Sequence, residues 1–234
     1  MLFPIGVENN FEGKSIAWSL TLPGCFAYGA DAATALMKMA RAIPETIQWY
    51  EEYQVPLWLD ASEIDIRLLE VWEGYEINDQ YERVDEGDHI GGWFLHDWKP
   101  LTAADVEHGL KVLAASRRDL LNTVHTLTQE QLERTYPGER WNILGILRHI
   151  GGVEWWYLER LGVAKMTREQ LPKDSLERLN AGRLELVEAL PGLVDQERVI
   201  GREGELWSPR KVLRRAAWHE RDHIAHIRQL LARE

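Results

Sequence analysis

Residues 207–226, WSPRKVLRRAAWHERDHIAH, decide the fold of the C-terminal half of this 234-residue chain. Ser208 is a good helix N-cap, and Pro209 suits the first helical position, where its missing N–H costs nothing. Apolar residues then recur with helical spacing at Val212, Leu213, Ala216, Ala217, Ile224, Ile227, Leu230 and Leu231. The stretch therefore predicts one long amphipathic helix.

The same helix carries two histidines at a spacing that suits metal binding. His219 and His223 are four residues apart, so they lie on one helix face, one turn from each other. This H-x-x-x-H spacing lets two imidazoles bind one metal ion, but a complete site needs at least one more ligand from elsewhere in the chain.

Composition limits the class of protein. Hydrophobic residues make up 45% of the chain, which is ordinary for a globular protein with a sizeable core. No apolar run approaches the roughly 20 residues of a membrane span, and Met1–Ile5 does not resemble the start of a signal peptide. The single cysteine, Cys25, excludes an internal disulfide, and we interpret it as a buried structural thiol in a cytoplasmic protein.

Charge limits the partners. The formal net charge of −11 argues against nucleic acid as a general partner, because a polyanion would be repelled. A local basic cluster is present at Arg210, Lys211, Arg214 and Arg215. We interpret this cluster as a solvated helix face.

The first 60 residues have the pattern of a small α+β domain. Residues 3–8, 15–22, 25–28 and 55–59 are predicted strands, and alternation is clearest in the second. A helix is predicted from Asp31, its cap, to about Tyr53. Pro44 should kink this helix or split it in two.

A family resemblance covers this part of the chain. The stretch LPGCFAYG at 22–29, followed by DAATAL at 31–36, resembles HicB-type antitoxin domains, with Thr34 where that family usually has Glu. The resemblance implies a small antiparallel sheet with a helix, in a domain that binds a protein partner. The stretch itself carries no catalytic pattern, and we carry over the HicB-like shape without an antitoxin role.

Residues 61–100 give weaker signals. Residues 67–73 and 92–95 are strand candidates, separated by an acidic, turn-rich segment. His89 and His96 lie near carboxylates and offer an alternative metal site, but we interpret them as ordinary surface or interface histidines.

From Thr102 the pattern becomes helical. Thr102 and Asp105 resemble a capping box, and helices are predicted over about 102–126, 141–161 and 174–190, before the helix that starts at Ser208. Four helices of similar length predict an all-α four-helix bundle. A short hairpin around Gly201 or Gly204 is expected before the last helix. We therefore expect a HicB-like α+β domain with an extension at 1–99 and a bundle at 100–234.

Two of these helices share a motif. The pattern W-x-x-x-x-(I/V)-L-R starts at Trp141 and again at Trp207, 66 residues later, and each copy is followed at the same offset by a glutamate, Glu154 or Glu220. Matching tryptophan and arginine positions go beyond helical periodicity, so we infer two αα units related by a pseudo-two-fold axis. Chance similarity of two amphipathic helices is the alternative.

His149, inside the second predicted helix, is the candidate third ligand. Alone it would be interpreted as a core histidine, but an H-x-x-x-H pair on a partner helix favours a shared site. The motif around Trp141 and His149, with WHERDHIAHI at 218–227, resembles the DinB or YfiT-like family. That resemblance implies a four-helix bundle with a divalent metal held by His149, His219 and His223. His226 stands where many members have Gln, and a fourth-ligand or supporting role is an alternative.

The resemblance also implies a choice of functions. One is a metal-dependent enzyme acting on a small molecule, either a thiol-dependent S-transferase or isomerase, or a hydrolase. The other is a non-enzymatic stress or regulatory protein with a HicB-like partner-binding domain and a structural metal. Zinc or nickel is expected, because imidazole suits both. Glu154 or Glu220 is a candidate to orient an imidazole N–H. A low-molecular-weight thiol as substrate and a homodimer remain open.

Overall fold

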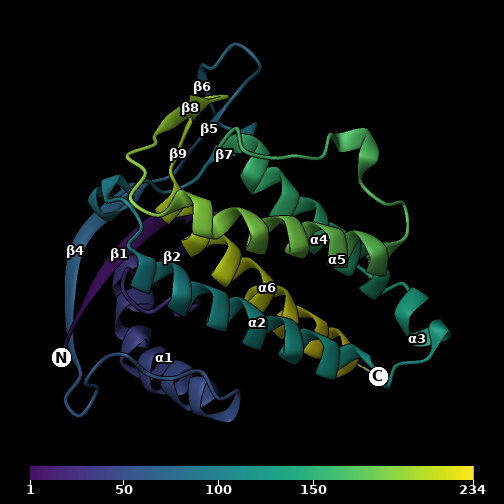
Figure 1. The fold of residues 1–234 in the computed structure, drawn as a ribbon, viewed down its shortest axis with the longest axis horizontal. Helices are drawn as coiled ribbons and strands as arrows, with labels where there is room; N and C mark the ends of the chain where they lie inside the picture. The colour runs from purple at the N-terminus through teal and green to yellow at the C-terminus, as the bar shows by residue number, and fades with distance from the viewer. Residues whose placement is uncertain (234) are drawn as a thin grey trace. The chain divides into compact units, whose positions relative to one another are not determined.

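The computed structural model describes residues 1–233, which form two compact units (Figure 1). The first unit contains Met1–Pro100 together with Glu197–Arg214, and the second contains Leu101–Gln196 together with Arg215–Glu234. The last helix, α6 (Pro209–Leu231), therefore begins in the first unit and continues in the second.

A mixed four-stranded sheet organises the first unit. Its strands β1 (Leu2–Phe11), β2 (Lys14–Ser19), β3 (Phe26–Gly29) and β4 (Asp65–Glu73) lie in the order β3-β2-β1-β4. β2 is antiparallel to both β1 and β3, whereas β4 is parallel to β1. An α+β region at the N-terminus is confirmed, but the sheet is not purely antiparallel.

Two strand predictions in this unit are wrong. Residues 55–59 form no strand, and the fourth strand lies at 65–73 instead. Pro56 has no N–H to donate to a sheet ladder, which disfavours a strand there. Residues 92–95 also form no strand, because the Asp97 carboxylate accepts from the Phe94 N–H at 3.0 Å and the chain turns into a 3-10 helix, η1 (Leu95–Trp98).

The helix α1 (Ala32–Glu52) packs against the β2–β3 part of this sheet. Asp31 is its N-cap and accepts from the Thr34 N–H at 2.7 Å. The helix continues through Pro44, so the predicted split is wrong. Buried side chains on both sides of the proline, including Met39 and Trp49, anchor the two halves and outweigh the hydrogen bond that proline removes.

Short strands complete the first unit. β5 (Tyr75–Ile77), β6 (Arg83–Val84) and β7 (Asp88–Ile90) form a sheet in the order β6-β5-β7, and β8 (Ile200–Arg202) pairs with β9 (Glu205–Trp207). The β8–β9 turn places Glu203 and Gly204 at φ of 49° and 76°, as a two-residue hairpin turn requires. The expected hairpin is thus confirmed.

The basic cluster at the start of α6 is not a solvated face. Lys211 is fully buried and donates to Glu205 at 2.7 Å, with its ammonium group over the Trp207 ring. Arg214 is buried and paired with Asp97 at 2.7 Å. Buried cations are stable only when paired and hydrogen-bonded, and both of these have such partners. The prediction of solvent exposure was wrong because the partners are distant in sequence.

Helices make up most of the second unit. They are α2 (Ala103–Val124), the short α3 (Gln129–Glu133), α4 (Ile143–Arg160), α5 (Ser175–Ala189) and the C-terminal part of α6, with 3-10 turns η2 (Arg168–Gln170) and η3 (Leu190–Leu193). Thr102 and Asp105 form the predicted capping box of α2. Gly162 follows α4 at φ of 70°, the left-handed conformation expected after a helix end.

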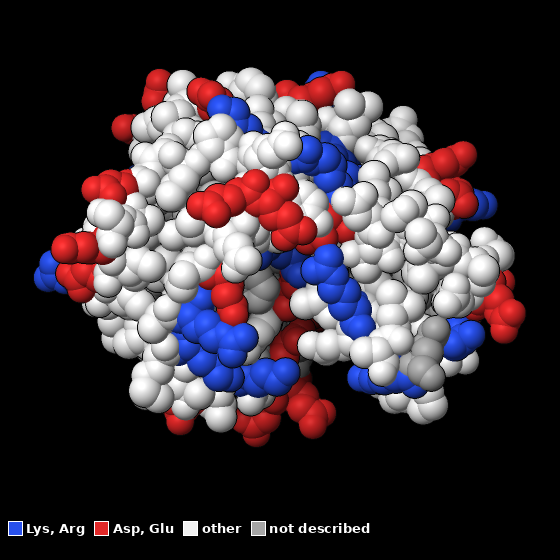
Figure 2. All heavy atoms as spheres, turned by 90° about the horizontal axis from the view of Figure 1, so that it is seen from below, with Lys and Arg blue, Asp and Glu red and all other residues white. Residues whose placement is uncertain are grey.

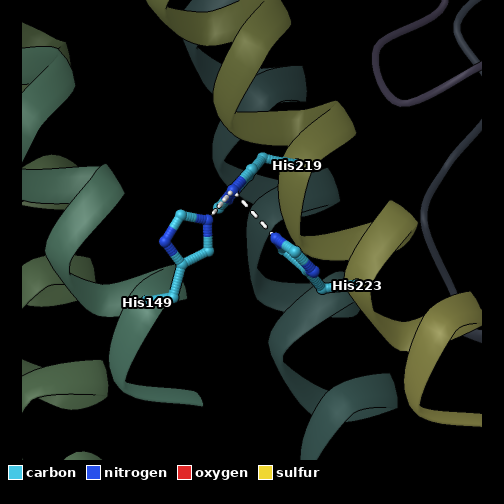
Figure 3. A group of neighbouring side chains, drawn as sticks. All are labelled: His149, His219 and His223. Carbon is cyan, nitrogen blue, oxygen red and sulfur yellow. Dashed lines mark hydrogen bonds between the residues drawn. The ribbon is translucent and has the colours of Figure 1, made fainter. Parts of the chain in front are cut away.

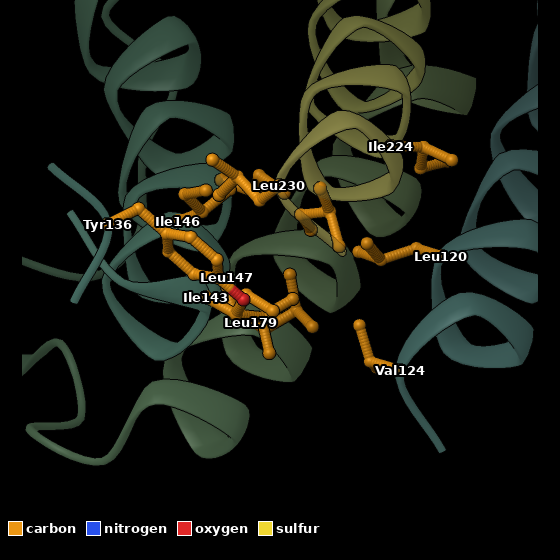
Figure 4. Close-up of a cluster of buried hydrophobic side chains, with 11 residues drawn as sticks. Leu120, Val124, Tyr136, Ile143, Ile146, Leu147, Leu179, Ile224 and Leu230 are labelled. Atoms are coloured by element: carbon orange, nitrogen blue, oxygen red, sulfur yellow. The ribbon is translucent and has the colours of Figure 1, made fainter. Parts of the chain in front are cut away.

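One buried apolar cluster joins these helices (Figure 4). Each fully buried leucine or isoleucine contributes about 1.5–3 kcal/mol relative to exposure. The cluster comprises Leu120, Val124, Tyr136, Ile143, Ile146, Leu147, Ile150, Leu179, Ile224, Ile227 and Leu230. It contains the C-terminal part of the apolar stripe that the sequence of α6 predicts, namely Ile224, Ile227 and Leu230. This packing fixes the rotation of α4 and α6 about their axes.

The charged residues of the surface are unevenly distributed. The face in Figure 2 carries acidic groups interspersed with clusters of lysine and arginine, so the negative net charge is not spread evenly. Within residues 1–233, none of the helices combines the length and apolar character needed to cross a membrane.

Candidate metal centre

Three histidines of the second unit converge on one point (Figure 3). His149 comes from the middle of α4, and His219 and His223 come from successive turns of α6. The Nε2 atom of His219 lies 3.1 Å from Nε2 of His149 and 3.1 Å from Nε2 of His223. The structure therefore brings together the three side chains that the sequence predicts as ligands.

Hydrogen bonding alone does not account for this arrangement. An imidazole nitrogen has either one proton or one lone pair, so Nε2 of His219 can make only one of its two contacts as an ordinary hydrogen bond. Three nitrogens bound to one ion at about 2.0–2.1 Å in tetrahedral geometry lie about 3.3 Å apart, close to the distances seen. The three residues thus fit a divalent metal.

The protonation state of the histidines also fits. Burial, with a smaller contribution from Arg140, lowers the pKa of His149 to about 4. Burial and the neighbouring His149 lower the pKa of His223 to about 3, and burial lowers the pKa of His219 well below its usual value. All three rings are therefore neutral at pH 7 and have lone pairs available, as metal ligation requires.

Aromatic rings surround the histidines. The Trp141 indole stacks on the His149 ring with centroids 4.5 Å apart and an interplanar angle of 27°. The Trp218 and His219 ring centroids are 5.7 Å apart, and Tyr157 meets His219 edge-on at 6.2 Å. These rings restrict the movement of the imidazoles and keep them in position before any ligand arrives.

The other histidines considered from the sequence have different surroundings. His226 contacts the Glu139 carboxylate through Nε2 at 2.9 Å, and its ring centroid is 6.3 Å from that of His223. His89 contacts Glu8 at 3.0 Å, and the pKa of His96 is lowered to about 4 by burial and by Arg210. Among the described residues, only the three convergent histidines form a group with metal-ligand spacing.

Glu154 and Glu220 do not orient an imidazole. Both carboxylates are buried and bind two arginines, Arg117 of α2 and Arg183 of α5. The Nδ1 atoms of His219 and His223 are buried and make no hydrogen bond to the described residues. The predicted role of these glutamates at the histidines is therefore wrong.

The four charged groups form a closed network. Arg117 Nε donates to Glu220 at 2.7 Å, and Arg183 Nε donates to Glu154 at 2.9 Å. Arg183 Nη2 also donates to Glu154. In addition, each arginine binds the other glutamate: Arg117 Nη2 donates to Glu154 at 3.2 Å, and Arg183 Nη2 donates to Glu220 at 2.7 Å. Burial raises the pKa of Glu154, whereas Arg183 and Arg117 lower that of Glu220 despite its burial. With two charges of each sign, the network is neutral overall.

This network has the pseudo-two-fold symmetry that the sequence repeat suggests. The arginines are 66 positions apart, as are the glutamates. Arg117 Nη1 donates to the carbonyl of Leu179, and Arg183 Nη1 donates to that of Leu113, again a pair 66 positions apart. The α2–α4 and α5–α6 segments thus use equivalent residues for equivalent bonds.

Sequence reasoning missed both arginines. The signal that would have found them is the same offset of 66 residues that links the two tryptophan motifs, applied to the first and third helices. The offset also shows where the symmetry breaks. The positions equivalent to His149, His219 and His223 hold Arg215, Val153 and Tyr157, so this group of histidines occurs once.

Comparisons with known proteins agree with this geometry. Residues 113–227 match the family model of the DinB superfamily, a range that includes all three histidines and both arginines. The protein named "Putative metal-dependent hydrolase OB0413", from Oceanobacillus iheyensis, is 27% identical in an alignment 155 residues long that covers 56% of this chain and 88% of the relative. No solved structure matches the chain. These findings show that the C-terminal part of the chain is similar to the DinB superfamily.

Proposed function

We propose that the chain is a metal-dependent enzyme acting on a small molecule, with the metal held by His149, His219 and His223 in a DinB-like four-helix bundle. The observation that carries this proposal is the convergence of three neutral imidazole nitrogens within 4.8 Å of one another. When bound there, a zinc or nickel ion would supply Lewis acidity.

The donor set favours catalysis over a purely structural role. Structural zinc sites are usually closed by four protein ligands and are rich in cysteine, whereas three protein ligands leave a coordination position for substrate. The single cysteine, Cys25, is buried in the first unit. Trp141 stacks on His149 and Trp218 neighbours His219, so aromatic rings flank these two histidines.

Hydrolysis is the first reaction to test, because the relative from Oceanobacillus iheyensis carries a hydrolase name. A thiol-dependent S-transfer or isomerisation is the second candidate, with a low-molecular-weight thiol as co-substrate. Turnover of activated esters and of alkylating electrophiles, each measured with and without added thiol, separates them. Turnover that requires the thiol supports S-transfer or isomerisation. Turnover at the same rate with and without the thiol supports hydrolysis.

A non-enzymatic regulatory protein is the competing function. The strand order of the first unit, with α1 between β3 and β4, is compatible with the HicB-like fold that the sequence suggests and hence with a partner-binding domain. A copurifying protein bound through this unit, together with the absence of turnover in every assay of the metal-loaded protein, would favour this function. A homodimer in the cytoplasm is compatible with either.

Metal analysis of the purified protein tests the site. We expect about one divalent ion per chain, and loss of most of it in His149→Ala and in His223→Ala. His226→Ala is the matched control, since His226 lies on the same helix but is bonded to Glu139. Equal metal content in all four proteins contradicts the proposal.

A further inference from the structure

Two arginines lie beside the convergent histidines, and each is stacked on a tryptophan. The Arg140 guanidinium lies over the Trp141 ring at 4.6 Å from its centroid, and Trp141 in turn stacks on His149. The Arg215 guanidinium lies over Trp218 at 4.8 Å, and Trp218 neighbours His219. Arg215 also precedes His219 by four residues, so the two side chains share one face of α6.

Charge around the histidines is one-sided. The arginines act on the site electrostatically, because Arg140 lowers the pKa of His149 and Arg215 lowers that of His219. One carboxylate, Glu220, opposes this effect at His223, but two buried arginines already compensate its charge. Neutral imidazoles leave the charge of a bound dication uncompensated, so the site has an excess of positive charge.

A cationic site of this kind favours an anionic ligand. Guanidinium groups bind carboxylates and phosphates through paired, charge-assisted hydrogen bonds. The tryptophans hold both guanidinium planes in place, which lowers the entropy lost when an anion binds. Glu139, which contacts His226, is bonded to His226 and Arg233 at 2.9 Å and 2.8 Å, so its charge is compensated. It therefore adds little negative charge.

We propose that the substrate of this site carries an oxyanion, a carboxylate or a phosphate, which Arg215 and Arg140 hold beside the three imidazoles. The inference rests on the proposed metal centre and names the substrate class of that same site. Arg215 is half-buried on the ligand helix and makes the larger contribution, whereas Arg140 is exposed and its contribution is weakened by solvent.

Anion binding to the cobalt-loaded protein tests this inference without an activity assay. Visible absorption of the cobalt ion reports ligands entering the site, and the titrants are acetate, inorganic phosphate and the neutral acetamide. We expect acetate or phosphate to bind and acetamide to bind much more weakly. The comparison of acetate with phosphate shows which oxyanion the site prefers.

Variants separate the arginines from the metal. Arg215→Gln should weaken anion binding about tenfold, and Arg140→Gln a few-fold, with cobalt content unchanged. Arg215→Lys keeps the charge but loses the paired hydrogen-bond geometry, so its anion affinity should lie between those of the wild type and Arg215→Gln, which guards against a folding defect in the Gln variant. Arg148→Gln is the matched control, because Arg148 is an exposed arginine on the same helix as His149.

The outcomes distinguish the two proposals. If the wild-type protein and all variants bind cobalt, but acetate and phosphate affinities do not change in Arg215→Gln and Arg140→Gln, the oxyanion inference is wrong and the metal centre stands. If acetamide binds as tightly as acetate, the inference is also wrong. If the wild-type protein binds no cobalt, the proposed function itself fails.

Discussion

Replacing Arg183 with methionine tests the buried charge network most severely. Arg183 is buried and donates hydrogen bonds to Glu154, Glu220 and the Leu113 carbonyl. Without it, Arg117 faces two buried carboxylates, and one negative charge is left uncompensated. Removing one partner of a buried ion pair typically costs 3–5 kcal/mol, so we expect the free energy of unfolding to fall by about 3–5 kcal/mol.

The loss in free energy of unfolding caused by Arg183→Met should depend on pH. In the variant, the repulsion between the buried carboxylates of Glu154 and Glu220 is relieved when one of them takes up a proton. Glu154 is the one expected to do so, because burial already raises its pKa. A carboxyl whose folded pKa lies above its unfolded pKa contributes stability at low pH that is lost as the pH rises. The difference between wild type and Arg183→Met should therefore be larger at pH 8 than at pH 5.

Urea unfolding followed by circular dichroism measures this difference, with chelator present to keep metal out of the comparison. The pseudo-two-fold symmetry adds a sharper expectation: Arg117→Met should cost about as much as Arg183→Met, to within about 1 kcal/mol. Lys111→Met is the matched control on α2, because its partner Glu107 is exposed and such a pair contributes about 0.3–0.5 kcal/mol. A cost for Arg183→Met similar to that of Lys111→Met would refute the reasoning.

Two further changes test the packing and the pH response. Gly182→Ala should destabilise the protein by about 1–3 kcal/mol in urea unfolding, since the new Cβ would lie 2.1 Å from the Gly151 carbonyl oxygen, where α5 meets α4. Gly152→Ala, whose Cβ meets nothing closer than 4.0 Å, should be neutral or stabilising by up to about 1 kcal/mol, and an equal loss in both variants contradicts this view of the contact. His96 has its pKa lowered to about 4 by burial and by Arg210, so the unfolded chain binds its proton at higher pH than the folded protein does. Stability from this group is complete above pH 6.5 and is lost as the pH falls towards 4, and His96→Gln should flatten that part of the stability profile; an unchanged profile contradicts it.

Local signals in the sequence predicted most of the helical part. The predicted capping residues Thr102 and Ser208 lie one residue before α2 and α6, and the helix predicted over about 174–190 is α5. The apolar stripe of α6 predicted its buried face, and the two histidine positions followed from the helical repeat. These features depend on residues within a few turns of each other, which is why they are readable from sequence.

Features that depend on distant partners were not predictable in this way. The strand candidate at 67–73 is confirmed as β4, but its parallel pairing with β1 involves a distant partner that no local pattern specifies. Lys211 and Arg214 look solvent-exposed in a helical projection, but each is buried against an acidic residue. Burial of a charge depends on a compensating charge, and the sequence does not show where that charge lies.

The candidate site falls between these cases. A resemblance to DinB-like proteins suggested the three histidines together, and periodicity alone gave only His219 and His223. The arginine network was missed because its four members come from four helices, although all of them obey the 66-residue repeat. Searching a chain for residues that share a repeat offset is therefore a useful step when two helices carry one motif.

X-ray absorption spectroscopy of the zinc-loaded protein tests the central claim most directly. The account predicts three imidazole nitrogens at about 2.0–2.1 Å from the metal, and one imidazole fewer in His149→Gln. A zinc environment with sulfur ligands, or one without imidazole that is unchanged in His149→Gln, would contradict a metal centre built from His149, His219 and His223.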